Sequence, residues 1–254
     1  MKSFTMKALA VAVLGLAGSS AYAVCPTIPA TTATPGGGGA WSSQTVTSAT
    51  VGNAPTGLNG TSCAFQVSIN PGAAANTKGI VTDNSPQDEK TYRARFYVNT
   101  AGLTGLTAAN RVFRVFNALA TTFPATAGAG SDEVIVFIGG GATPFVRFFV
   151  GDTASPGSYK NIAAVFPNTA GNYRIEFALD SNAGTFRYWV SDAAAATTDA
   201  APTGSATVTQ TGWSGVKLVN LGIFGTSANY RTNVAGQALI VDEFDSRRQT
   251  FIGQ

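Results

Sequence analysis

The chain has 254 residues, of which 16 are basic and 13 are acidic, so its formal net charge is only +3. It contains no histidine, which excludes Ser-His-Asp and Cys-His catalytic sites and removes the commonest protein ligand of zinc. Charged residues make up only 11% of the chain, and so weak a charge gives no support for nucleic acid as a partner.

The first 23 residues have the organisation of a secretory signal peptide. Lys2 and Lys7 supply positive charge, residues 8–18 form an apolar run, and residues 21–23 (Ala-Tyr-Ala) form a small-x-small cleavage site. The apolar run is shorter than the roughly 20 residues that span a bilayer, and no later segment reaches that length. We therefore predict cleavage before Val24 and secretion to the cell surface or the medium, without a transmembrane anchor. The mature chain has 14 basic and 13 acidic residues, a net charge of +1.

Residues 24–40 form a leader rich in Pro, Thr and Gly, which we expect to be flexible. Cys25 lies in this leader and Cys63 lies 38 residues further on, and the chain has no other cysteine. An even count in an oxidising compartment predicts a Cys25–Cys63 disulfide, which the chain-entropy model values at about 4 kcal/mol. Its expected role is to tie down the N-terminal segment rather than to serve redox chemistry or metal binding.

Short runs of β-forming residues follow from residue 41 onward, separated by Gly, Asn, Asp and Pro. The predicted strands are 41–47, 63–69, 91–99, 111–117, 133–138, 144–150, 172–180, 185–191, 216–224 and 237–244. No window has sustained helical periodicity, and the Ala-rich stretch 193–201 is predicted to be a loop because Thr and Asp interrupt it. Residues 41–254 are therefore predicted to form one all-β domain, a sandwich or a barrel.

The strongest local prediction is a hairpin of strands 172–180 and 185–191, joined by a turn centred on Asn182. In this register Leu179 faces Phe186, Phe177 faces Tyr188, and Ile175 faces Val190, so the two apolar faces coincide. The opposite face is expected to be wet, as in a two-layer antiparallel sandwich. It carries Arg174, Glu176, Arg187 and Trp189.

The C-terminal half contains, in order, the hairpin GNYRIEFALDSNAGTFRYWVSD, the strand VKLVNLGIFG and the closing strand LIVDEFDSRRQTFIG. Together these three segments resemble the concanavalin A-like and laminin G-like jelly-roll superfamily. The resemblance covers roughly residues 90–250. It implies two curved antiparallel sheets, often a glycan or protein ligand, and often calcium at a rim, but no single activity.

No cofactor is predicted from the residues themselves, although calcium is left open by this resemblance. The candidate oxygen ligands are Asp83, Asp88, Glu89 and Asp152. They fall in two stretches, residues 81–90 and residues 150–157. Calcium requires 6–8 oxygen ligands, and neither stretch has EF-hand spacing, so ordinary solvated turns are the favoured interpretation of both stretches.

Some members of the superfamily are glucanases with two Glu and one Asp on a single strand. In this chain Glu243 and Asp245 match the first half of that pattern, while Ser246, Arg247 and Arg248 occupy the place of the second Glu. Neighbouring arginines lower carboxylate pKa values and oppose the protonated acid that glycoside hydrolysis needs. We therefore favour structural ion pairs for these two carboxylates. A weak glycoside hydrolase that uses Glu243 and Asp245 is kept as an alternative function.

Several arginines alternate with aromatic residues on predicted strands; for example, Arg93 and Arg95 share a face with Tyr97. A surface of Arg174, Arg187 and Trp189 could bind an acidic polysaccharide through guanidinium pairs and ring stacking. Trp213, in a turn-like segment, is a second candidate for ligand binding. The competing interpretation, which we favour for the arginines, is that they cover the sheet and form ion pairs, and a lid on the core is equally favoured for Trp213.

Together these observations predict a secreted, single-domain antiparallel two-sheet β-sandwich of the jelly-roll type. Its predicted function is non-catalytic recognition of an extracellular glycan, such as an acidic polysaccharide, or of a surface protein. No catalytic residue is assigned. The alternative from a different class is a structural surface or fimbria-like subunit, which the low charge and small residues would suit.

Overall fold

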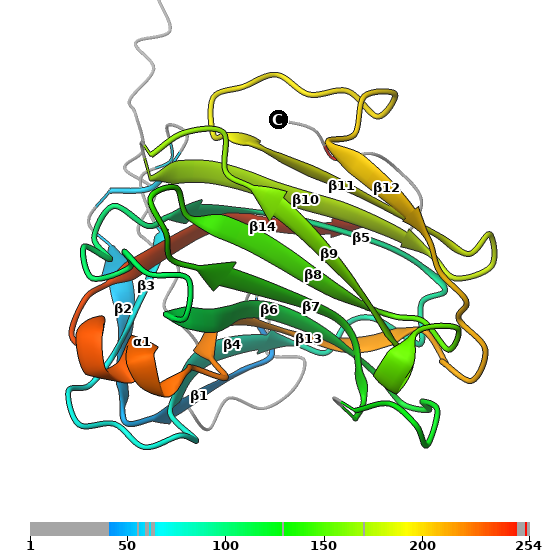
Figure 1. The fold of residues 1–254 in the computed structure, drawn as a ribbon, viewed down its shortest axis with the longest axis horizontal. Coiled ribbons are helices and arrows are strands. Elements are labelled where there is room, and N and C mark those ends of the chain that lie inside the picture. Colours follow the sequence, from blue (N-terminus) through cyan, green and yellow to red (C-terminus); the bar gives the residue numbers. More distant parts are fainter. Residues whose placement is uncertain are drawn as a thin grey trace, which may run out of the picture.

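The computed structural model describes residues 41–54, 56–58, 61, 64–128, 130–169, 171–247 and 252. Two antiparallel seven-stranded sheets pack face to face as a single-domain sandwich (Figure 1). Cys25, Cys63 and the predicted signal peptide lie outside the described residues, so the disulfide and the cleavage site stay predictions. Within the described ranges, no helix is long and apolar enough to cross a membrane.

The first sheet has the strand order β1-β4-β13-β6-β7-β8-β9. Its strands, in chain order, are β1 (Ser43–Thr47), β4 (Lys78–Asp83), β6 (Val112–Ala120), β7 (Asp132–Gly139), β8 (Phe145–Gly151), β9 (Tyr159–Val165) and β13 (Val216–Phe224). A short 3-10 helix, η1 (Pro156–Ser158), precedes β9.

The second sheet has the order β12-β11-β10-β5-β14-β3-β2. It comprises β2 (Ala49–Ala54), β3 (Ala64–Ile69), β5 (Thr91–Asn99), β10 (Asn172–Asp180), β11 (Thr185–Asp192), β12 (Gly204–Thr207) and β14 (Leu239–Arg247). The helix α1 (Ala228–Asn233) follows β13 and is capped by Ser227, whose Oγ accepts a hydrogen bond of 3.1 Å from the Tyr230 amide.

All ten predicted strands are present, with small differences at their ends. The prediction missed β2, β4, β9 and β12, as well as the helix α1. The stretch 193–201 is a loop with turns, as predicted.

The core lies between the two sheets and is rich in aromatic rings. Phe96 of β5 stacks on Phe116 of β6 with ring centroids 5.6 Å apart, and Phe148 of β8 meets Phe186 of β11 at 5.4 Å. Both pairs join one sheet to the other, which is the arrangement expected of a sandwich.

The predicted hairpin is confirmed residue by residue. Leu179 pairs with Phe186, Phe177 with Tyr188, and Ile175 with Val190 across β10 and β11. All six side chains are buried in the core.

The opposite face of this hairpin was predicted to be solvent-exposed, and that prediction is wrong for most of its residues. Arg174 and Glu176 have no exposed surface, and Trp189 is 1% exposed. Chain segments cover this outer face of the second sheet, so its charged side chains lie in a buried polar layer rather than in solvent.

Candidate functional site

The outer face of the second sheet carries an ordered array of charged and aromatic side chains. Strand pairing sets them in three rows across β11, β10, β5 and β14, because residues that are Cα partners lie on the same face of a sheet. The first row is Arg174, Tyr97 and Asp242; the second is Trp189, Glu176, Arg95 and Asp245; the third is Arg187, Ala178, Arg93 and Arg247.

Tyr97 lies near the middle of this array, between two arginines. The Arg95 guanidinium carbon is 5.3 Å from the centroid of its ring, and Arg174 is its partner on β10. Burial raises the pKa of the Tyr97 phenol, while the charges of Arg95 and Arg174 act in the opposite direction. The hydroxyl is therefore protonated at neutral pH, beside two positive charges.

Arg174 is a fully buried cation on the outside of a sheet. Its Nη2 donates to Thr197 Oγ1, and its Nε finds no hydrogen-bond acceptor among the described residues. Burial lowers its pKa, and the neighbouring Glu176 and Tyr97 raise it, but a guanidinium keeps its proton in proteins. Burying a cation with an unused hydrogen-bond donor lowers the stability of the fold unless another interaction compensates. Such groups concentrate at functional sites.

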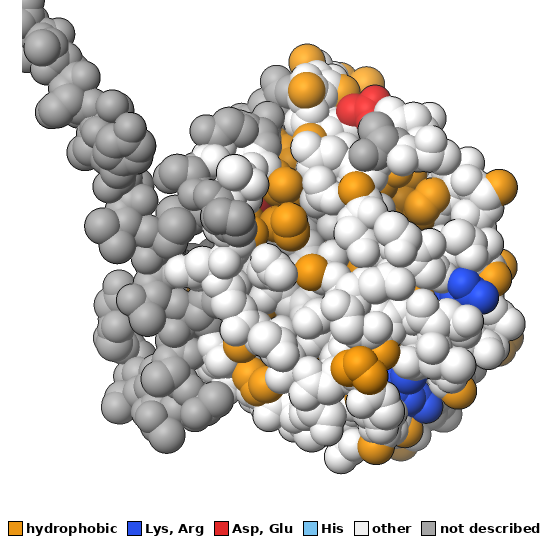
Figure 2. Space-filling view, turned by 90° about the vertical axis from the view of Figure 1, so that its left-hand side faces the viewer, with side chains coloured by type: hydrophobic (Ala, Val, Ile, Leu, Met, Phe, Trp, Pro, Cys, Tyr) orange, Lys and Arg blue, Asp and Glu red, His pale blue; other side chains and the backbone are white. Residues whose placement is uncertain are grey.

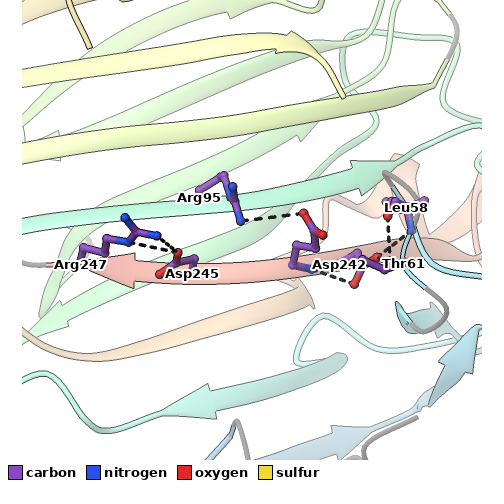
Figure 3. Close-up of polar contacts among 7 residues, drawn as sticks. Leu58, Thr61, Arg95, Asp242, Asp245 and Arg247 are labelled. Atoms are coloured by element: carbon purple, nitrogen blue, oxygen red, sulfur yellow. Dashed lines mark hydrogen bonds and ion pairs between the residues drawn. The ribbon is translucent and has the colours of Figure 1, made fainter. Parts of the chain in front are cut away.

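A β-bulge in β14 places acidic side chains beside this group. The pairing of β14 with β5 shifts between Asp242 and Asp245, and Glu243 has a φ of 46°, which is uncommon for a residue with a side chain. Phe244 packs inward against Trp41 and Phe116. The bulge lets the acidic residues on both sides of Phe244 lie on the outer face (Figure 3). Strained backbone of this kind clusters at functional sites.

The acidic side chains of β14 are all engaged (Figure 3). Glu243 lies 3.9 Å from Arg95, and Asp245 forms a 2.9 Å ion pair with Arg247. Asp242 accepts a hydrogen bond of 2.7 Å from the Leu58 amide and another from Thr61. Both carboxylates of the hydrolase alternative thus have an arginine partner, as the structural interpretation of these residues expects.

The segment of residues 193–202, here called the cover segment, crosses this face between β11 and β12 and is yellow in Figure 1. Asp199 bridges Arg93 at 2.9 Å and Arg187 at 3.2 Å. The Trp189 indole donates to the Thr198 carbonyl at 3.0 Å. On the same face, the Ile252 amide donates to Glu176 Oε1 at 3.2 Å.

Three of the four predicted binding residues therefore share one face, and the fourth does not. Arg174, Arg187 and Trp189 belong to the array, with only Arg187 substantially exposed, at 34% of its side chain. Trp213 is 2% exposed and packs beside Tyr159, with ring centroids 5.6 Å apart. Trp213 is thus a buried side chain that lies outside the array.

Two of the candidate calcium ligands, Asp83 and Asp152, brace turns, and Asp88 accepts a hydrogen bond of 2.8 Å from the Thr121 hydroxyl. Asp83 accepts from the amide and hydroxyl of Ser85, and Asp152 accepts from the Thr209 amide at 2.9 Å. Among the described residues, no three acidic or other metal-binding side chains come together in one place.

One further carboxyl outside the array has a strongly perturbed proton affinity. Glu133 at the start of β7 is fully buried and accepts a 3.3 Å hydrogen bond from Ser181. Burial raises its pKa from 4.5 to about 7, although Lys90 opposes the shift. In the folded protein Glu133 therefore holds its proton at pH values where the unfolded chain has released it.

This difference predicts a pH-dependent stability. Because the folded state binds the proton more tightly, the free energy of unfolding should fall by about 3 kcal/mol as pH rises from 4.5 to about 7. Glu133→Gln should remove most of that slope and unfold less readily than the parent at pH 8. Urea unfolding across this pH range measures the effect, with Glu89→Gln as the control. Equal slopes for the parent and Glu133→Gln would show that Glu133 ionises normally.

Charge is sparse on another side of the molecule. Figure 2 shows mostly uncharged surface with small, separate patches of basic and acidic side chains. The array on the second sheet differs because it gathers arginines and carboxylates on four adjacent strands. It is therefore the candidate site for a charged ligand.

Solved structures with a similar fold include carbohydrate-active enzymes. An endo-β-1,4-glucuronan lyase from the fungus Trichoderma reesei matches 83% of this chain and 92% of its own, with 13% identity and a TM-score of 0.56. A carbohydrate esterase from the Shiga toxin-encoding bacteriophage phi24B matches 82% and 91%, with 12% identity and a TM-score of 0.53. An alginate lyase in complex with an alginate tetrasaccharide matches 73% and 81%, with 14% identity and a TM-score of 0.51.

No protein-family profile matches the chain, and neither does any curated protein sequence. The similar structures support the predicted sandwich. They contradict the prediction of a non-catalytic recognition protein, because these neighbours are two polysaccharide lyases and a carbohydrate esterase.

Proposed function

We propose that this chain is a carbohydrate-active enzyme that cleaves an acidic polysaccharide by β-elimination on the outer face of its second sheet. The observation that carries the proposal is the group of Arg95, Tyr97 and Arg174, two cations around a buried phenol outside the hydrophobic core. Folding alone gains little from burying such charges. Two of the similar structures are lyases, one named for glucuronan and one bound to alginate.

The two arginines fit the electronic demand of elimination from a uronic acid. The reaction breaks the C–H bond next to the sugar carboxylate, so negative charge develops there before the double bond forms. A guanidinium held against that carboxylate neutralises the charge as it develops. Arg174 is suited to this role because it is fully buried and its Nε has no acceptor among the described residues.

Proton transfer can be assigned on the same face. The C–H proton must reach a base, and Glu176 and Glu243 are the carboxylates on either side of Arg95. The bond from the next ring carbon to the glycosidic oxygen then breaks, and that oxygen needs a proton. The neutral hydroxyl of Tyr97, whose pKa is raised by burial, is suited to donate it.

The alternatives to elimination lack the required groups. Ester hydrolysis by a Ser-His-Asp triad needs a histidine, and this chain has none. Glycoside hydrolysis needs one carboxyl kept protonated, whereas Glu243 and Asp245 each lie beside an arginine.

Substrate screening of the purified mature chain tests the proposed function. Glucuronan and alginate should lose chain length on size-exclusion chromatography, and a neutral glucan should not. The rate should fall as salt rises, because ions screen the attraction between arginines and carboxylates. Cleavage of the neutral glucan alone, or of none of the three polymers, would contradict the proposal.

A further inference from the structure

The third row of the array has the geometry of a carboxylate-binding subsite. Arg93 and Arg187 are the two Cα partners of Ala178, one on each side of β10. The small side chain between them leaves room above the sheet for a planar anion that meets both guanidinium groups.

In this structure the chain fills that place with its own carboxylate. Asp199 Oδ1 lies 2.9 Å from Arg93 Nη1 and 3.2 Å from Arg187 Nη2. Burial works against ionisation of Asp199, but the hydrogen bond from Arg93 and the charges of both arginines outweigh it, so its pKa lies below the usual value. Asp199 is thus an anion held between two cations.

The cover segment that carries Asp199 is attached mainly by polar contacts. Its residues are Ala, Thr, Asp and Pro, and Ala193 is its one buried side chain. The other contacts include Thr197 with Arg174, Thr198 with Trp189, and Asp199 with its two arginines. A segment with so little buried apolar surface is among the easiest parts of a fold to open.

We infer that Arg93 and Arg187 form a binding subsite for a uronate carboxylate of the polysaccharide, and that Asp199 occupies it in place of the substrate until the chain is bound. This inference rests on the proposed function, since it extends the same face to a longer substrate. Arg93 and Tyr97 are four residues apart on β5, about 13 Å at the usual rise of a strand. The subsite therefore holds a sugar a few units away from the bond that is cleaved.

Opening of the cover segment follows from the same exchange. Binding of a substrate carboxylate to Arg93 and Arg187 releases Asp199. The adjacent Thr197 and Thr198 are then held to the sheet only by their own contacts with Arg174 and Trp189. The buried Tyr97 and Arg174 then become accessible to the polymer. Asp199 competes with the substrate carboxylate for the two arginines. The apparent affinity for the polysaccharide is therefore the intrinsic affinity multiplied by the fraction of molecules in which the subsite is free.

Titration calorimetry with a glucuronan hexasaccharide tests this inference, using Tyr97→Phe as the background so that cleavage is slow during the titration. Adding Asp199→Ala should lower the dissociation constant of the hexasaccharide by about 5- to 150-fold, the usual range of coupling between ligand binding and a conformational change. The control is Asp83→Ala, which makes the same change in charge on the other sheet and should leave the affinity unchanged. Adding Arg187→Gln to Asp199→Ala should abolish the gain, because the subsite itself is then incomplete.

Unchanged or weaker binding by Asp199→Ala overturns the inference. So does a gain that Asp83→Ala reproduces or that survives Arg187→Gln, since both would indicate a general effect of charge. Absence of binding by every variant overturns it as well. Failure of the proposed function has a separate signature, because the chain with Tyr97 intact would then leave glucuronan uncut whatever the titrations show.

Discussion

Tyr97→Phe is expected to lower kcat/KM for glucuronan by about 10²- to 10⁴-fold, the usual contribution of a positioned general acid. The substitution removes one hydroxyl and keeps the ring, so the contact with Arg95 at 5.3 Å from the ring centroid can persist. Binding of the hexasaccharide should change little, because the arginines that hold the carboxylates remain. The loss should therefore appear in kcat rather than in KM.

A matched control removes a hydroxyl from the other face of the same sheet. Tyr188 on β11 points into the core, next to Phe148, and Tyr188→Phe should keep most of the activity. For the arginines, Arg174→Lys should lose activity, whereas Arg147→Lys on β8 of the first sheet should not. If Tyr97→Phe and Tyr188→Phe retained equal activity, Tyr97 would have no part in proton transfer.

The largest loss of stability is expected at the centre of the core. Phe177→Ala should lower the free energy of unfolding by about 3–5 kcal/mol, through lost burial and the cavity that remains. Phe177 is fully buried, with ring contacts to Phe116 at 5.4 Å and to Phe186 at 5.8 Å. The contact with Phe116 joins the two sheets and the contact with Phe186 lies within the second sheet, so neither sheet can close the cavity by itself.

Phe123→Ala is the control for this experiment, because Phe123 is 39% exposed in a loop and should cost much less. Urea unfolding of the two variants and the parent measures the difference. Equal losses would mean that Phe177 does not occupy the centre of the core.

The hairpin of β10 and β11 was predictable because its apolar residues alternate strictly and a four-residue turn fixes the register. The strands that were missed lack that alternation. β12 (Gly-Ser-Ala-Thr) and β9 lie at sheet edges, where one side of the strand needs no partner. β2 contains Gly and Asn, which are disfavoured in strands. Tertiary pairing, rather than local preference, determines these strands.

The candidate site was predictable only in part. Alternation placed Arg174, Arg187 and Trp189 on one face, and it also placed Arg95 and Tyr97 together on β5. No local signal indicated that residues 193–202 would cover that face. The ion pair of Arg93 with Asp199 joins residues 106 positions apart, and the segment itself contains only small or polar residues and one proline. Charge pairing over such a distance requires the fold to be known first.

The bulge at Glu243 could not be predicted from sequence patterns either. Simple alternation would have put Asp242 and Phe244 on the same face, whereas the structure sends Phe244 into the core and leaves Asp242 outside. A non-glycine residue with a positive φ at this point depends on the packing of Phe244 and the pairing with β5.

The mass of the products formed from glucuronan tests the central claim most directly. Elimination breaks each glycosidic bond without adding water, so one of the two fragments at each cleavage should carry a new double bond conjugated with its carboxylate. Mass spectrometry should therefore find the double bond in every fragment except the one that keeps the original non-reducing end of the polymer, and Tyr97→Phe should yield almost no unsaturated fragments. Saturated fragments throughout, with one water added for each cleaved bond, would show hydrolysis and would contradict elimination on the face of Arg95, Tyr97 and Arg174.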